Sequence, residues 1–69
     1  MIEVAPQSRF IRTYDEAWLY CLTLSYNGHK DWTMPSRILW MNDSRFAGWY
    51  EGRDDVAVLD FPVTPVRDI

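Results

Sequence analysis

The segment Ala17–Ser36 constrains the fold of this chain more than any other part of the sequence. It begins with Ala-x-x-Tyr-Cys, passes through Asn27-Gly28, and ends with Asp-Trp-x-Met-Pro-Ser. Asparagine and glycine tolerate the left-handed backbone conformation that stops a helix. The proline disfavours helix for the residue before it. The segment therefore predicts a helix capped at Gly28, followed by a turn into a second helix.

The first helix is predicted to begin at Thr13. The sequence Thr-Tyr-Asp-Glu at this point has the form of a capping box, in which Thr13 accepts a hydrogen bond from the third helical amide and Glu16 reaches back. Apolar residues at Ala17, Cys21 and Leu24 recur with the spacing i, i+4, i+7. This spacing gives one broad apolar face on a helix of roughly three turns.

The second helix is predicted over residues Arg37–Asn42. Trp32 belongs to a short extended piece, and Pro35 keeps the preceding residue out of the helical region. Ser36 then supplies a side chain well suited to the N-cap position.

The rest of the chain predicts a small antiparallel sheet. The expected extended segments are a short strand around Arg9–Arg12, a hairpin of Phe46–Tyr50 and Asp55–Phe61, and an edge strand over Val63–Arg67. Helices followed by antiparallel strands predict an α+β fold, here as one small domain over residues 1–69.

Composition limits how such a domain is held together. The chain has 69 residues and a single cysteine, Cys21, which excludes an internal disulfide and a metal site built from several cysteines. Aromatic residues make up 16% of the sequence. They add buried area that so short a chain needs, and an excess of them also suits an interface with a partner or a second copy.

Charge and hydropathy exclude two classes of partner. The net charge is −3, and the seven Lys and Arg residues form no basic stripe, which disfavours nucleic acid. No apolar run reaches membrane-spanning length, and the first residues lack a basic region followed by an apolar stretch. We expect a cytoplasmic protein of the producing or host cell, with association to a virion as the alternative.

The order of these motifs resembles one small-domain family. The shared elements are Ala17-x-x-Tyr20-Cys21, Gly28, Asp31-Trp32-x-Met34-Pro35-Ser36 and Val63-Thr64-Pro65-Val66-Arg67. In this order they resemble the C-terminal domain of collagen-like bacterial adhesins, which belongs to the C-type-lectin-like and sulfatase-modifying superfamily. The resemblance covers residues 13–67, and the chain departs from the family pattern at Thr33, Leu39 and Thr64.

The resemblance implies a shortened lectin-like frame: a capped helix and a short second helix packed on a small antiparallel sheet. The residues expected to hold that frame are Thr13, Glu16, Ala17, Cys21, Gly28, Trp32, Pro35 and Ser36. The long loop region that carries ligand sites in lectin-like folds is missing. The resemblance therefore implies a scaffold more than a ligand site.

Catalytic and metal sites are not expected. A lectin-type calcium site needs several converging oxygen ligands, and the nearest match, Trp40-Met41-Asn42-Asp43, is interrupted by Met41. The sulfatase-modifying enzymes use paired cysteines, which the chain lacks. Cys21 would need an orienting histidine to act as a nucleophile, but His29 lies beyond the expected helix end. We expect no enzymatic activity, no cofactor and no metal.

The strongest candidate for a function is an aromatic and acidic hairpin. Trp49 and Tyr50 would face opposite sides of a strand, so one ring would leave the core. The predicted binding residues are Trp49, Tyr50, Arg45, Arg53, Glu51, Asp54 and Asp55. An exposed aromatic ring rimmed by arginine is typical of a protein interface.

The sequence thus favours a non-enzymatic binding module that contacts another protein or a second copy of itself, in the style of a phage or mobile-element accessory protein. Two alternatives stay open. One is an inhibitor of a host enzyme that acts through the acidic hairpin, and the other is a carbohydrate-binding or structural subunit of a virion or surface assembly.

Overall fold

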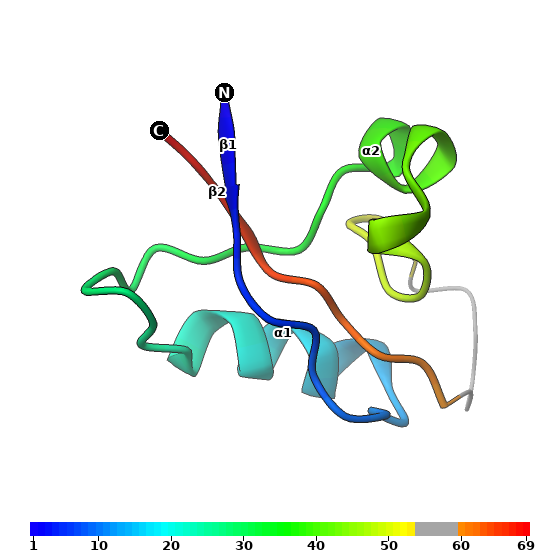
Figure 1. Ribbon diagram of the computed structural model, residues 1–69. Coiled ribbons are helices and arrows are strands. Elements are labelled where there is room, and N and C mark those ends of the chain that lie inside the picture. Colours follow the sequence, from blue (N-terminus) through cyan, green and yellow to red (C-terminus); the bar gives the residue numbers. More distant parts are fainter. Residues whose placement is uncertain (54–59) are drawn as a thin grey trace.

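Helices and a small sheet share the chain, and the predicted α+β class is confirmed (Figure 1). The computed structural model describes residues 1–53 and 60–69. Within these residues the elements are β1 (Ile2–Val4), α1 (Tyr14–Thr23), α2 (Arg37–Asn42), the 3₁₀ helix η1 (Ser44–Phe46) and β2 (Val66–Asp68).

The sheet joins the two ends of the chain. β1 pairs with β2 in antiparallel register, with Glu3 opposite Arg67 and Val4 opposite Val66, and both termini lie close together in Figure 1. On the other side of β2, Thr33 and Val66 exchange two backbone hydrogen bonds of 2.8 Å each. The last strand therefore lies between the first residues and the Trp32 segment. Sequence analysis missed β1 and expected β2 slightly earlier, over Val63–Arg67.

The start of α1 follows the prediction at Thr13, but within the described residues the Glu16 carboxylate accepts no hydrogen bond from the Thr13 amide. The Thr13 hydroxyl accepts a hydrogen bond from the Glu16 amide at 3.1 Å. The carboxylates of Asp15 and Glu16 in the first turn interact favourably with the positive end of the helix dipole. Ala17 and Cys21 are fully buried on the inner face. The cap and the apolar spacing together therefore set where α1 starts and how it faces the core.

The predicted end of α1 is wrong. The helix stops at Thr23, because Leu24 is extended. Asn27 (φ 54°) and Gly28 (φ 79°) lie in a separate turn that is closed by hydrogen bonds between Tyr26 and His29. Two consecutive left-handed residues match a two-residue turn with positive φ at both central positions, for which Asn-Gly is the preferred pair.

The second helix has the predicted bounds. The Ser36 hydroxyl accepts from the Leu39 amide at 3.2 Å, as an N-cap should. The helix is short, and its Ile38 and Met41 side chains are exposed.

The first strand of the predicted hairpin is not formed. Phe46–Tyr50 is not a strand, because the Asp43 carboxylate accepts from the Arg45 amide at 3.0 Å and starts η1. Such local side-chain bonds compete with strand formation. Phe61 forms an isolated antiparallel bridge with Ile11. Within the described residues, the strand expected around Arg9–Arg12 is reduced to this one bridge. Most of the other predicted hairpin strand, Asp55–Phe61, falls outside the described residues.

Trp49 lies at the centre of the core. It packs with the buried residues of α1, with Met34 and with Val63, and its indole Nε1 donates to the carbonyls of Ile11 (3.2 Å) and Phe61 (3.1 Å). One side chain thereby ties the first residues of the chain to the last ones. Among the described residues no helix is long and apolar enough to span a membrane.

Candidate functional site

The two aromatic residues predicted to bind a partner have different environments. Trp49 is fully buried and makes the core contacts described above, so it does not reach a partner. Tyr50 is half-buried, and its ring lies 4.9 Å from the ring of Trp40, centroid to centroid. The exposed aromatic platform expected at the hairpin is therefore not present in this form.

Two of the charged residues predicted around this platform, Arg45 and Glu51, have separate partners. Arg45 is bound to the Asp43 carboxylate, with its Nη2 at 2.6 Å and its Nε at 2.9 Å. Glu51 is exposed, and its backbone amide donates to the Pro35 carbonyl. Asp54 and Asp55 lie outside the described residues, so no acidic cluster is assembled in the described part of the chain.

Arg53 is the exception among the predicted residues, because it lies in an aromatic environment. Its Nη1 donates to the Gly48 carbonyl at 2.9 Å. The guanidinium carbon lies 4.4 Å from the ring centroid of Phe61 and 6.0 Å from that of Trp40. Cations in such positions are attracted to the aromatic face.

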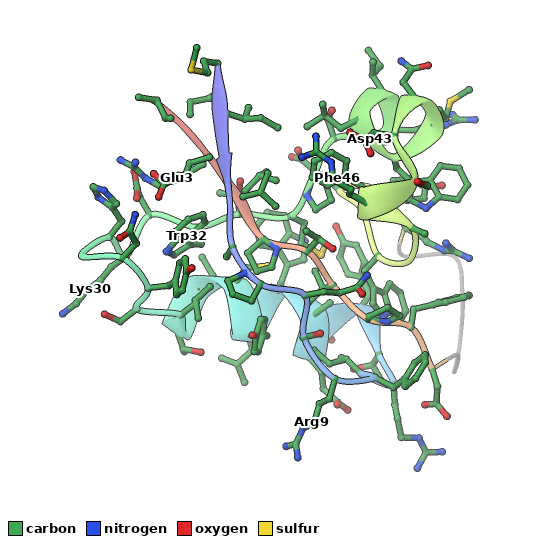
Figure 2. All side chains as sticks on the ribbon, in the orientation of Figure 1. Glu3, Arg9, Lys30, Trp32, Asp43 and Phe46 are labelled. Atoms are coloured by element: carbon green, nitrogen blue, oxygen red, sulfur yellow. The ribbon has the colours of Figure 1, made fainter. Side chains whose placement is uncertain are left out.

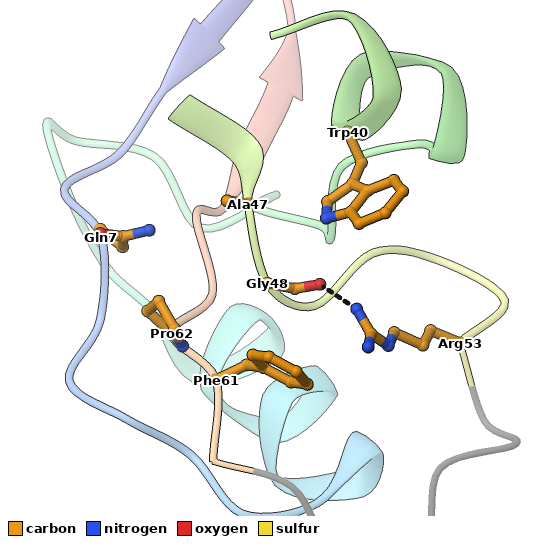
Figure 3. Close-up of a pocket in the computed structure, with 7 residues that line it drawn as sticks. All are labelled: Gln7, Trp40, Ala47, Gly48, Arg53, Phe61 and Pro62. Carbon is orange, nitrogen blue, oxygen red and sulfur yellow. Dashed lines mark hydrogen bonds between the residues drawn. The ribbon is translucent and has the colours of Figure 1, made fainter. Parts of the chain in front are cut away.

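A pocket of about 400 Å³ opens beside Arg53 (Figure 3). We call it the aromatic pocket, and its lining residues are Gln7, Trp40, Ala47, Gly48, Arg53, Phe61 and Pro62. The wall is mostly apolar, and its polar groups are few. The indole Nε1 of Trp40 is buried and has no hydrogen-bond partner within the described chain.

A second depression, of about 610 Å³, lies along the outer side of α1. We call it the α1 groove, and it is lined by Arg9, Phe10, Ile11, Arg12, Glu16, Leu19, Tyr20 and Thr23. Phe10 and Leu19 are 70% and 60% exposed, and the neighbouring Leu22 is 63% exposed. In Figure 2 the labelled Arg9 extends away from the body of the molecule on this side. The groove is therefore an open apolar surface with charged edges.

A charged cluster, which we call the terminal clasp, fixes the end of the molecule opposite η1. Arg67 binds Glu3 at 2.8 Å and Asp31 at 2.7 Å, and the Asn27 amide also donates to Glu3 at 2.7 Å. The hydrogen bonds from Asn27 and Arg67 lower the pKa of Glu3, and the hydrogen bond from Arg67 lowers that of Asp31. These contacts hold β1, β2 and the Asn27 turn together, which is a structural role.

Cys21 and His29, the pair considered for nucleophilic chemistry, lie in different surroundings. Burial raises the pKa of the Cys21 thiol to about 12, so the reactive thiolate is scarce at neutral pH. His29 lies 4.0 Å from Glu3, in the terminal clasp. No three His, Cys, Asp or Glu side chains of the described residues are grouped to hold a metal ion.

Several residues predicted as structural occupy core, cap or turn positions, whereas Glu16 is exposed at the α1 groove. Trp32 is buried, and its Nε1 donates to the His29 carbonyl at 3.1 Å. Pro35 is also fully buried. The predicted binding residues leave out Trp40 and Phe61 of the aromatic pocket, Phe10 and Leu19 of the α1 groove, and the exposed Leu22 beside it. Leu19 and Leu22 could have been found, because they form an apolar pair three residues apart on the side of α1 away from Ala17 and Cys21.

Comparisons of the chain with family models, curated proteins and solved structures gave no match. The resemblance to the adhesin domain therefore stays a prediction.

Proposed function

We propose that the protein is a non-enzymatic binding module that acts by protein–protein contact, with the α1 groove as its binding surface. The observation that carries this proposal is the pair of exposed apolar side chains Phe10 and Leu19 at one open groove, with the exposed Leu22 three residues after Leu19 on α1. Contiguous exposed apolar side chains with a polar rim are characteristic of interaction surfaces.

These side chains are not needed for the protein's own core. α1 already buries its other face, through Ala17 and Cys21. Each exposed leucine would gain roughly 1.5–3 kcal/mol if a partner removed it from water. The outer face of α1 is therefore the part of the helix that favours association.

The charges of the groove favour one kind of partner. Arg9 and Arg12 line it beside one carboxylate, that of Glu16, so the groove carries a net positive charge on a chain whose net charge is −3. Arg9 has no ion-pair partner within residues 1–53 and 60–69, and Arg12 approaches Asp60 only to 3.9 Å between exposed groups. Exposed pairs at such distances contribute little. We therefore commit to a partner segment with apolar side chains flanked by carboxylates, which the two arginines would attract and orient.

The proposal can be tested by peptide selection. A random peptide library is displayed on phage, selected against the full chain, and the enriched peptides are measured by calorimetry at low and high salt. We expect apolar residues next to Asp or Glu. The double variant Leu19→Ser/Leu22→Ser should weaken binding by about 10- to 100-fold, and Arg9→Gln/Arg12→Gln should reduce both the affinity and its salt dependence.

A matched control exists on α2. Ile38 and Met41 are 71% and 63% exposed, so Ile38→Ser/Met41→Ser removes a similar apolar surface outside the groove and should leave binding intact. Equal losses in both double variants would contradict the proposal. A dimer seen by sedimentation that Leu19→Ser/Leu22→Ser dissociates would instead identify a second copy as the occupant, and the acid-flanked partner would be wrong.

A further inference from the structure

The aromatic pocket is a second surface that shares no lining residue with the α1 groove. Its walls come from segments far apart in the sequence: Gln7 from the first residues, Trp40 from α2, Gly48 and Arg53 from the segment after η1, and Phe61 from the last part of the chain. Figure 3 shows these side chains around one space, with the bond from Arg53 to Gly48 at its centre. The fold therefore assembles the pocket without help from α1.

The hydrogen-bonding state of Trp40 sets this pocket apart. Trp49 donates to two carbonyls and Trp32 to one, whereas the Trp40 indole N–H is shielded from solvent and lacks an acceptor in the described chain. Buried donors are nearly always satisfied, and an unsatisfied one carries its full desolvation penalty. A ligand that supplies an acceptor there would remove this penalty.

The wall of the pocket favours an aromatic group. Phe61, Pro62 and Ala47 provide apolar surface, and the Arg53 guanidinium already stacks on Phe61 at 4.4 Å. A cation between aromatic faces can stack on a further ring. The backbone of Gly48 packs directly against that of Pro62, because an added Cβ would lie 2.2 Å from the Pro62 carbonyl oxygen. The wall of the pocket at Gly48 is therefore bare backbone.

We propose that the aromatic pocket binds an aromatic side chain carried by a peptide, whose carbonyl oxygen accepts a hydrogen bond from Trp40 Nε1. A neutral amide is sufficient, because the donor is neutral and Arg53 is already engaged with the Gly48 carbonyl. Because the indole N–H is shielded in the unliganded structure, the pocket wall beside Trp40 opens as the ligand enters. A pocket of about 400 Å³ is within the range that accommodates small ligands.

The test uses nuclear magnetic resonance on the full, ¹⁵N-labelled chain, which has four tryptophans and so gives four indole N–H signals. The probe is N-acetyl-L-phenylalaninamide. We expect its addition to shift the Trp40 indole signal, while those of Trp18 and Trp32, which do not line the pocket, stay in place. Trp40→Phe keeps a ring but removes the donor, and should weaken probe binding by about 2- to 10-fold.

Two further probes separate the ligand classes. Toluene has the ring without an acceptor and should bind more weakly than the amide. The free acid N-acetyl-L-phenylalanine should bind no more tightly than the amide. Tighter binding of the acid would show that the pocket selects anions, and the proposal of a neutral acceptor would be wrong. An unmoved Trp40 signal at saturating amide would overturn the site altogether. The Leu19→Ser/Leu22→Ser variant should bind the amide as well as the unaltered chain does, so failure at the groove is distinguishable from failure at the pocket.

Discussion

The surroundings of Trp49 and Trp40 differ in almost every respect, although the two side chains are identical. Trp49 is fully buried, donates to two carbonyls, and meets Tyr14 and Phe61 edge-on at 6.3 and 5.8 Å. Trp40 is half-buried at the wall of a pocket, stacks on Tyr50, and has an N–H without an acceptor in the described chain.

This difference separates a residue that holds the fold from one that is available to a ligand. The indole of Trp49 joins the first residues of the chain, the Phe61 segment and α1, so every part of its surface has a native partner. The indole of Trp40 has one polar atom that the described fold leaves unsatisfied. A side chain of the first kind contributes to stability, and one of the second kind offers a contact that only binding completes.

The largest expected effect is that of removing Trp49. Trp49→Ala should lower the free energy of unfolding by about 3–5 kcal/mol, because it leaves a large cavity and removes the two indole hydrogen bonds, although the Ile11 and Phe61 carbonyls each keep a backbone donor. Such a loss is close to the whole stability of many small domains. Chemical denaturation followed by circular dichroism measures it. Trp40→Ala should lower the free energy of unfolding by less than half as much. Equal losses for the two variants would contradict the difference in role between Trp49 and Trp40.

The next largest effect concerns Gly48, which positions the Trp49 backbone beside Pro62. Its φ is +121°, and an added Cβ would lie 2.2 Å from the Pro62 carbonyl oxygen. Gly48→Ala should therefore destabilise the protein by about 2–4 kcal/mol, from both backbone strain and the clash.

Gly28 is a matched control for this substitution. It also has a positive φ, of 79°, but an added Cβ there would meet nothing within 4 Å. Gly28→Ala should cost only about 1 kcal/mol, the penalty of the left-handed conformation alone. A Gly48→Ala variant as stable as Gly28→Ala would contradict the close packing at Pro62.

A smaller loss of folding stability should appear at low pH. It arises from carboxylates and not from Trp49 or Trp40, because an indole does not titrate in this range. Hydrogen bonds from Asn27 and then from Arg67 lower the pKa of Glu3, and a hydrogen bond from Arg67 lowers that of Asp31. Their stabilisation is therefore fully present above the ordinary carboxyl pKa values and is lost as the pH falls through the lowered ones. Unfolding measured from pH 6 to about pH 2 should show this loss, and Arg67→Gln should flatten the profile. Trp40→Phe should leave the slope unchanged.

The parts of the fold that the sequence predicts are those determined by neighbouring residues. Thr13 and Ser36 cap their helices with their own side chains, and Ala17 and Cys21 mark the buried face by their spacing. Asn27-Gly28 shows the limit of such local reasoning. The pair does adopt left-handed conformations, but it turns the chain after the helix has already ended.

The rest depends on contacts between distant residues. Phe61 pairs with Ile11, and Val4 with Val66, and no local pattern states which segments meet. Of the predicted binding residues, Arg53 lies at a surface that could bind a ligand, while Trp49 is in the core. The aromatic pocket could not be predicted, because Gln7, Trp40 and Phe61 meet only once the chain has folded.

One measurement tests the central claim, that the Trp49 indole holds the fold while the Trp40 indole is left for a ligand. Trp49→Phe and Trp40→Phe make the same chemical change, and the free energy of unfolding of each is compared with that of the unaltered chain. We predict a loss of about 2–4 kcal/mol for Trp49→Phe, and a change within about 1 kcal/mol, of either sign, for Trp40→Phe. A loss for Trp40→Phe as large as that for Trp49→Phe would contradict the account.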